Sequence, residues 1–312
     1  MTKKKKDKTR AVQNSLANTI DATEQKTRYD ECVKRILAEK EILARILQGC
    51  APEFKNVPIS QIVDKCIEGV PQISTIAVDQ DALAPEVEER LSGSQIEGQN
   101  TEDVSIREGK VFYDVRFSAI APGEKEPIQL IVNVEAQNDV KLKYPITKRA
   151  LYYVSRLISA QKNKVFFNSE YEKIRKVYSI WILAETSEQK QNTVTRYRIV
   201  EERLVGNASE EESAYDLLTV VMIRLGDPDA AESKSLLRFL DVLLSKELQA
   251  VKKKATLQRD FGVSMTTNVE KEIEDMCSLA EGIWSRANEE GQKIGEKRGE
   301  KRGEKRGEKA WR

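Results

Sequence analysis

The sequence contains no histidine among its 312 residues. This absence excludes Ser-His and Cys-His nucleophile pairs, histidine-dependent nucleases and most transition-metal sites, because each of these depends on an imidazole. If the chain is an enzyme, carboxylates, lysines and a hard cation such as Mg²⁺ are the groups that remain for its chemistry.

Cysteine is scarce as well, and long apolar runs are missing. The four cysteines are scattered without a close pair, which favours reduced thiols over disulfides or a zinc site. No segment approaches the roughly 18 consecutive apolar residues of a membrane span. The lysine-rich N-terminus is not followed by an apolar stretch, so a secretory signal is not expected. These features predict a cytoplasmic protein that neither spans nor binds a membrane.

Charged residues make up 33% of the chain, but the net charge is only +1. Basic residues gather at Lys3–Lys6 and after Lys293, whereas acidic residues fill the middle. The total charge therefore gives no argument for or against nucleic acid, although the local basic stretches could meet phosphates.

Composition and periodicity divide the chain into four parts. Residues 1–28 are predicted to form a disordered basic arm, and residues 29–205 a domain that mixes helices and strands. Residues 206–290 are predicted to be a helical C-terminal region, and residues 291–312 a charged tail of GEKR repeats. Glycine at every fourth position weakens a helix, so this tail is expected to be solvated and marginally helical.

Apolar residues recur at helical spacing in three stretches: from Tyr29 to Gln48, from Ile146 to Lys162, and from Glu211 onward. The stripe of the middle helix is expected to bury Leu151. Residues 177–183 and 193–200 are predicted to be further strands.

Residues 110–120 and 128–137 alternate apolar and polar side chains, which predicts a β-hairpin. The symmetric register pairs Ile120 with Gln129, and it then places Asp114 opposite Glu135, with Cβ atoms about 5 Å apart. Gln137 lies two residues further on the same face. Two carboxylates this close repel each other unless a cation lies between them, and such a pair suits Mg²⁺-assisted phosphodiester hydrolysis. A merely solvated strand face is the alternative, but Glu135 interrupts a very apolar strand, where a charge is costly.

Three segments, YDVRF, IVNVEAQND and KRALYYVSRLISAQ, resemble the PD-(D/E)XK nuclease superfamily. Within it they are similar to the bacterial PD-(D/E)XK nuclease family transposases, which are related to recombination-promoting nucleases. The resemblance covers about residues 101–226, and more loosely the helix from Tyr29. It implies an α/β (α+β) fold with a restriction-endonuclease-like core in the 29–205 domain. In this fold a mixed central β-sheet is flanked by helices, and here a helical C-terminal extension follows.

The resemblance also implies site residues. Asp114 matches the motif Asp and Glu135 the motif Glu, and both would bind Mg²⁺ or Mn²⁺. Gln137 stands where most members have lysine, so it can replace that group only as a neutral hydrogen-bonding partner. A further acid and a supporting layer are implied too. The candidates for the acid are Asp30, Glu31 and Glu102, and those for supporting the site or touching DNA are Arg149, Tyr153 and Gln161.

Three functions remain open. The first is a Mg²⁺-dependent DNA endonuclease linked to transposition or recombination, with Asp114, Glu135 and Gln137 as its catalytic residues. The second, motivated by Gln137, is a catalytically degraded DNA-binding or transposition-associated protein. The third is an interaction protein whose leucine-rich C-terminal helices mediate oligomerisation, for example as a homodimer.

The repeat tail gives a first prediction. Removing residues 291–312 is expected to shift the melting temperature by less than about 2 °C, because only Ile294 and Trp311 offer large apolar side chains to bury. Thermal unfolding of the full and shortened chains measures this. A drop of several degrees would show that the tail packs against the rest of the protein.

Overall fold

The computed structural model describes residues 23–73, 102–105, 109–112, 114–122, 128–137, 144–184, 186–226 and 235–310. Its centre is a six-stranded sheet in the order β1-β4-β5-β6-β8-β7. These strands are β1 (Ile67–Ile73), β4 (Val115–Ala121), β5 (Ile128–Gln137), β6 (Lys176–Leu183), β8 (Leu218–Arg224) and β7 (Thr193–Arg198). Strands β5, β6 and β8 are parallel, and the other pairings are antiparallel. The predicted mixed sheet flanked by helices is confirmed.

The predicted hairpin is present as β4 and β5, in the predicted register. Ile120 is paired with Gln129, and Val115 with Val134. The first strand is not continuous, however. Residues 109–112 form β3 (Gly109–Phe112), which pairs with β2 (Glu102–Ser105) in a separate two-stranded sheet. The predicted strand over 110–120 is therefore two strands, because β3 ends at Phe112 and β4 begins at Val115, immediately after Asp114.

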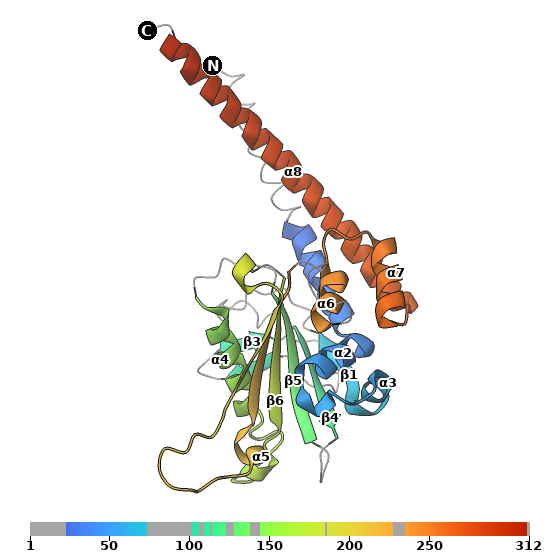
Figure 1. Ribbon diagram of the computed structural model, residues 1–312, viewed down its shortest axis with the longest axis vertical. Helices are drawn as coiled ribbons and strands as arrows, with labels where there is room; N and C mark the ends of the chain where they lie inside the picture. Colours follow the sequence, from blue (N-terminus) through green and yellow to red (C-terminus); the bar gives the residue numbers. More distant parts are fainter. Residues whose placement is uncertain are drawn as a thin grey trace.

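Helices cover both faces of the sheet (Figure 1). Helix α4 (Ile146–Ser159) packs on one face, against Trp181, Val220 and other residues of β6 and β8. The helix at residues 23–37, α2 (Lys40–Cys50) and α6 (Leu236–Leu244) belong to the core on the other face. Because β5, α4 and β6 form a parallel crossover, α4 begins near the ends of β5 and β6 where their carboxyl termini lie.

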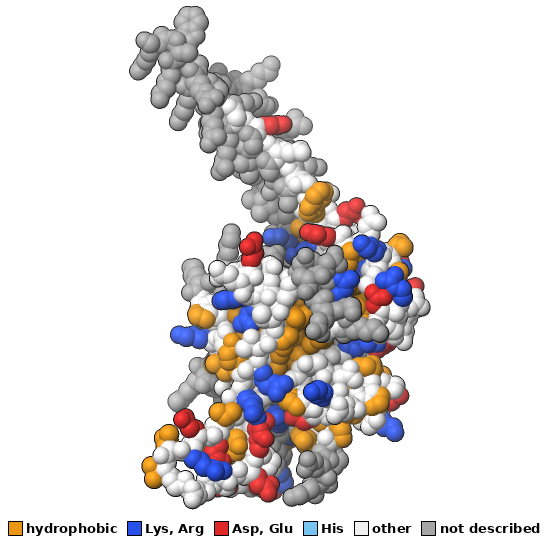
Figure 2. All heavy atoms as spheres, in the orientation of Figure 1, with side chains coloured by type: hydrophobic (Ala, Val, Ile, Leu, Met, Phe, Trp, Pro, Cys, Tyr) orange, Lys and Arg blue, Asp and Glu red, His pale blue; other side chains and the backbone are white. Residues whose placement is uncertain are grey.

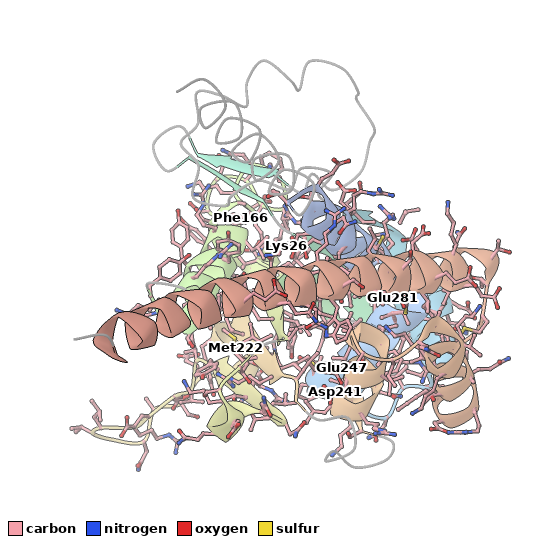
Figure 3. All side chains as sticks on the ribbon, turned by 90° about the horizontal axis from the view of Figure 1, so that it is seen from above. Lys26, Phe166, Met222, Asp241, Glu247 and Glu281 are labelled. Atoms are coloured by element: carbon pink, nitrogen blue, oxygen red, sulfur yellow. The ribbon has the colours of Figure 1, made fainter. Side chains whose placement is uncertain are left out.

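The remaining helices are short, apart from the last two. They are η1 (Pro52–Phe54), α3 (Ile59–Gln61), η2 (Ile62–Cys66), η5 (Tyr171–Lys173), η6 (Glu188–Lys190), α5 (Glu212–Tyr215), α7 (Ala250–Phe261) and α8 (Thr267–Ala310). Helix α8 packs through Val269, Ile273 and Met276, then extends away from the body as a long rod (Figure 1). Glu281 lies on α8, as labelled in Figure 3. The helix reaches Ala310, so the GEKR repeats are more regular than expected.

Several secondary-structure predictions were wrong. The helical pattern expected from Glu211 onward misses β8, because a strand buried on both faces is a continuous apolar run and lacks period-two alternation. Strand β1 was missed for a different reason, because its Gly and Pro residues are typical of turns and interrupt the strand pattern. The helix expected from Tyr29 to Gln48 begins at residue 23 and breaks at Ala38–Glu39, before α2. Residues 1–22 of the predicted arm lie outside the described residues.

The stripe of α4 is also rotated from the prediction. Leu151 is 40% exposed, whereas Tyr153 is buried together with Ala150, Val154 and Leu157. Among the helices in the described parts of the chain, none is both long and apolar enough to cross a membrane. The proposed division at residues 205 and 290 remains a prediction.

Candidate functional site

Asp114 and Glu135 face each other across β4 and β5. The backbone N–H of Asp114 donates to Glu135 Oε1 at 3.2 Å, and the N–H of Ala136 donates to Asp114 Oδ2 at 3.0 Å. Each carboxylate therefore accepts a hydrogen bond from the backbone of the opposite strand. Both side chains are buried. The N–H of Asp114, just before β4, thus donates to a side chain and not to the backbone of β5.

Burial and repulsion by the charge of Asp114 both change the pKa of Glu135. Burial raises the pKa of Glu135 well above its usual value of 4.5, and the charge of Asp114 raises it further. The bond from the Asp114 N–H, the charge of Arg149 and a 3.1 Å bond from Asn133 Nδ2 to Oε1 act in the opposite direction. The pair thus holds negative charge in a place that disfavours it, and a bound cation would relieve that cost.

A lysine from the first helix reaches this pair. Lys34 Nζ lies 2.9 Å from Asp114 Oδ1, and its side chain is only 13% exposed. Burial acts to lower the pKa of Lys34, but Asp114, Glu135 and Asp30 raise it above its ordinary value. Lys34 is therefore held as an ammonium ion at the carboxylate pair.

Arg149 approaches from α4, on the other layer of the fold. Its guanidinium lies 5.3 Å from the centre of the Tyr153 ring and 5.6 Å from that of Trp181. Its Nη2 also donates to the hydroxyl of Tyr153 at 3.3 Å. Trp181 is the residue of β6 in register with Glu135, and its indole donates to Ser179 Oγ at 2.8 Å. The two rings hold Arg149 in place, and its charge acts to lower the pKa of Glu135.

The structure brings together most of the expected site residues. Gln137 ends β5 on the same face as Glu135, and its carbonyl accepts the N–H of Ala184 at 3.2 Å. Asp30 lies one helical turn before Lys34 and close enough to raise its pKa. Arg149 and Tyr153 form the layer beside Glu135.

Three other candidates lie elsewhere or stay open. The charge of Glu31 raises the pKa of Arg35. Arg35 pairs with Glu272 of α8 and not with the carboxylate pair. Gln161 exchanges two hydrogen bonds with the backbone of Arg175, at 2.9 and 2.8 Å. Arg175 precedes β6, and Trp181, the partner of Glu135, lies six residues later, about 20 Å further along at the rise of a strand. Gln161 is therefore held near the opposite end of β6 from Glu135. The backbone of Glu102 pairs with that of Phe112, but its side chain lies outside the described residues.

Sequence reasoning missed Lys34, Asn133 and Trp181. Asn133 could have been found, because it precedes Glu135 by two residues on the same strand face. The contact of Lys34 with Asp114 joins positions eighty residues apart in the chain, for which a single sequence carries no signal. Trp181 sits in an apolar strand and resembles ordinary core.

The described residues include no group of three or more His, Cys, Asp or Glu side chains arranged to hold a metal ion. Mg²⁺, however, commonly uses only one or two carboxylates and completes its shell with water and phosphate oxygens. The hard oxygens of Asp114 and Glu135 fit such a cation. A cavity of about 770 Å³ lies elsewhere, lined by residues such as Gln129, Lys176 and Asp216 near the opposite ends of β5 and β6.

Comparison with known proteins gives one result. No curated protein and no solved structure matches the chain. The family described as PD-(D/E)XK nuclease family transposase matches residues 95–302, about two thirds of the sequence. The match contains Asp114, Glu135 and Gln137, and it extends beyond the sheet into α8. With this match over most of its length, the chain belongs to the PD-(D/E)XK nuclease family transposases.

Proposed function

We propose that this protein hydrolyses phosphodiester bonds in DNA with a divalent cation, Mg²⁺ or Mn²⁺, bound by Asp114 and Glu135. The observation that carries the proposal is the direct opposition of these two buried carboxylates across β4 and β5. Buried like charges raise the free energy of the folded protein unless a cation joins them. Membership of a nuclease family supports the same conclusion.

The cation and the residues around the pair would have different roles in the hydrolysis. A divalent cation at this position would neutralise charge on the scissile phosphate and lower the pKa of an attacking water. Asn133 keeps Glu135 oriented through its 3.1 Å hydrogen bond. Gln137, on the same face, carries an amide that can both donate to and accept from a water molecule. Arg149, held by two aromatic rings, would offset the negative charge beside Glu135.

DNA is the substrate that we propose, in the setting of transposition or recombination. On the face shown in Figure 2, basic and acidic side chains are interspersed. Such a mixture favours recognition of phosphates by a few fixed cations over a broad electrostatic attraction.

A catalytically degraded DNA-binding protein is the second candidate. It is favoured by one specific observation, the neutral Gln137 at the position where most of the superfamily has lysine. A nicking assay separates the two candidates, because a degraded site would bind DNA without cutting it.

The first test uses supercoiled DNA with and without Mg²⁺. The wild-type protein is expected to nick it only when Mg²⁺ is present. Asp114→Asn and Glu135→Gln keep the shape of each side chain but remove its charge, so each is expected to slow nicking more than about a hundredfold. Arg203→Gln, on an exposed surface pair, is the control and should leave nicking unchanged. Equal cutting by all variants would contradict the proposal.

Gln137→Ala tests the role of the unusual motif residue. The truncation removes an amide that can orient water but removes no ligand of the cation. We expect nicking to slow by about tenfold to a hundredfold, with DNA affinity in a gel-shift assay unchanged. If the wild type, Gln137→Ala and Glu135→Gln all show the same negligible cleavage, the site is a relic and the DNA-binding candidate replaces the enzyme.

The raised pKa of Glu135 predicts how stability depends on pH in metal-free protein. A carboxyl whose pKa is higher in the folded state destabilises the protein as pH rises above its unfolded value of 4.5. Glu135→Gln should therefore raise the melting temperature at pH 7 in the presence of a chelator, and this gain should vanish below pH 4. Glu281→Gln, on the exposed surface of α8, should show no such difference. A loss of stability in Glu135→Gln at pH 7 would contradict a raised pKa of Glu135 in the folded protein.

A further inference from the structure

The carboxylate pair lacks the positive charge that a motif lysine would bring, because Gln137 is neutral. The structure supplies an ammonium group from a different element. We propose that Lys34, on the helix at residues 23–37, provides the positive charge that Gln137 cannot provide at the Asp114–Glu135 site. This inference rests on the proposed function and names one further residue that acts at the same site.

The position of Lys34 is fixed by packing and not by the ion pair alone. The helix at residues 23–37 buries one stripe of side chains, formed by Tyr29, Cys32, Val33, Ile36 and Leu37. The hydroxyl of Tyr29 also donates to the carbonyl of Leu244 at the end of α6, at 3.4 Å. Lys34 projects from this anchored helix onto Asp114 Oδ1 at 2.9 Å. The protein thus pre-orients the ammonium before any ligand arrives.

Arg149 does not fill the same role, although it is the other cation near Glu135. Its guanidinium lies over the rings of Tyr153 and Trp181, and it influences Glu135 without a hydrogen bond or ion pair that joins the two among the described contacts. Lys34 is in direct contact with a carboxylate of the pair. The two cations approach from opposite layers of the fold, so a phosphate above the pair would meet one on each side.

The charges predict two effects of opposite sign. In the metal-free protein, Lys34 occupies Asp114 and repels a second cation, so it should weaken metal binding. During hydrolysis, negative charge develops on the phosphate, and an ammonium held beside it should stabilise that charge. A lysine with only a structural role would not produce this combination, because its loss would weaken both metal binding and cleavage by disordering the site.

The family match does not account for Lys34, because it begins at residue 95. The residue is contributed by a segment that lies before the matched region, and the helix is held against the matched region by Arg35, which pairs with Glu272 of α8. The proposal therefore concerns how this chain completes its site.

The experiment compares the full-length wild type with Lys34→Met, Lys34→Arg and Lys26→Met. Methionine keeps most of the length of the lysine side chain without its charge, whereas arginine restores the charge. Lys26 is exposed on the same helix and serves as the matched control (Figure 3). Mn²⁺ affinity is measured by titration calorimetry without DNA, and nicking of supercoiled DNA is measured at saturating Mg²⁺. Circular dichroism and melting temperature establish that each variant is folded.

For Lys34→Met we expect Mn²⁺ to bind about tenfold more tightly and nicking to slow by about a hundredfold. Lys34→Arg should recover most of the nicking, and Lys26→Met should match the wild type in both measurements. Tighter Mn²⁺ binding with unchanged nicking would overturn the proposal, because Lys34 would then only compete with the cation. Parallel losses of affinity and nicking would also overturn it, because they indicate a structural role.

The two proposals fail in different ways. A folded wild type that binds Mn²⁺ but never nicks DNA contradicts the proposed function. The calorimetry of Lys34→Met then decides alone whether the charge of Lys34 acts on the cation, and an unchanged Mn²⁺ affinity overturns that coupling. If the wild type nicks DNA and Lys34→Met nicks it equally well, the proposed function stands and the inference about Lys34 fails.

Discussion

The site depends on the register between β4 and β5, which places Asp114 opposite Glu135. A slip of one residue would move every side chain of one strand to the other face, and the two carboxylates would separate. The buried apolar residues on the other face of the hairpin, such as Phe117 and Val132, oppose such a slip because it would expose them to the polar side. Hydrophobic packing on one face of the sheet therefore fixes the positions of the two carboxylates on the other.

The face of the sheet that carries Glu135 also buries several other polar side chains. Asn133 and Ser179 are fully buried on the face that carries Glu135. Asn133 Nδ2 donates to Glu135 and Ser179 Oγ accepts from Trp181, whereas Asn133 Oδ1 has no hydrogen-bond partner among the described residues. A buried polar group is tolerated when it is paired. These polar side chains orient Glu135 and Trp181, and Trp181 in turn supports Arg149. A core optimised only for stability would place apolar side chains at these positions.

The sequence predicted the parts of the fold that rest on local periodicity, and it failed where the environment decides. The alternation in residues 128–137 was sufficient to give the register of Ile120 with Gln129. Strand β8 was not recognised, because an apolar run has no period that distinguishes a buried strand from a helix. The exposure of Leu151 depends on how α4 rests on β6 and β8. The approach of Lys34 to Asp114 depends on the whole tertiary arrangement, and no pattern within either segment predicts it.

The anchoring of the first helix has a consequence for biosynthesis. Tyr29 donates to Leu244, and Arg35 pairs with Glu272, so this helix is held by segments made 215 and 237 residues later. Domains that depend on contacts distant in sequence complete folding late, after most of the chain has been synthesised. A nascent chain cannot fix Lys34 at Asp114 through these contacts until α8 has left the ribosome. The order of synthesis thereby delays this contact until α6 and α8 have both been made.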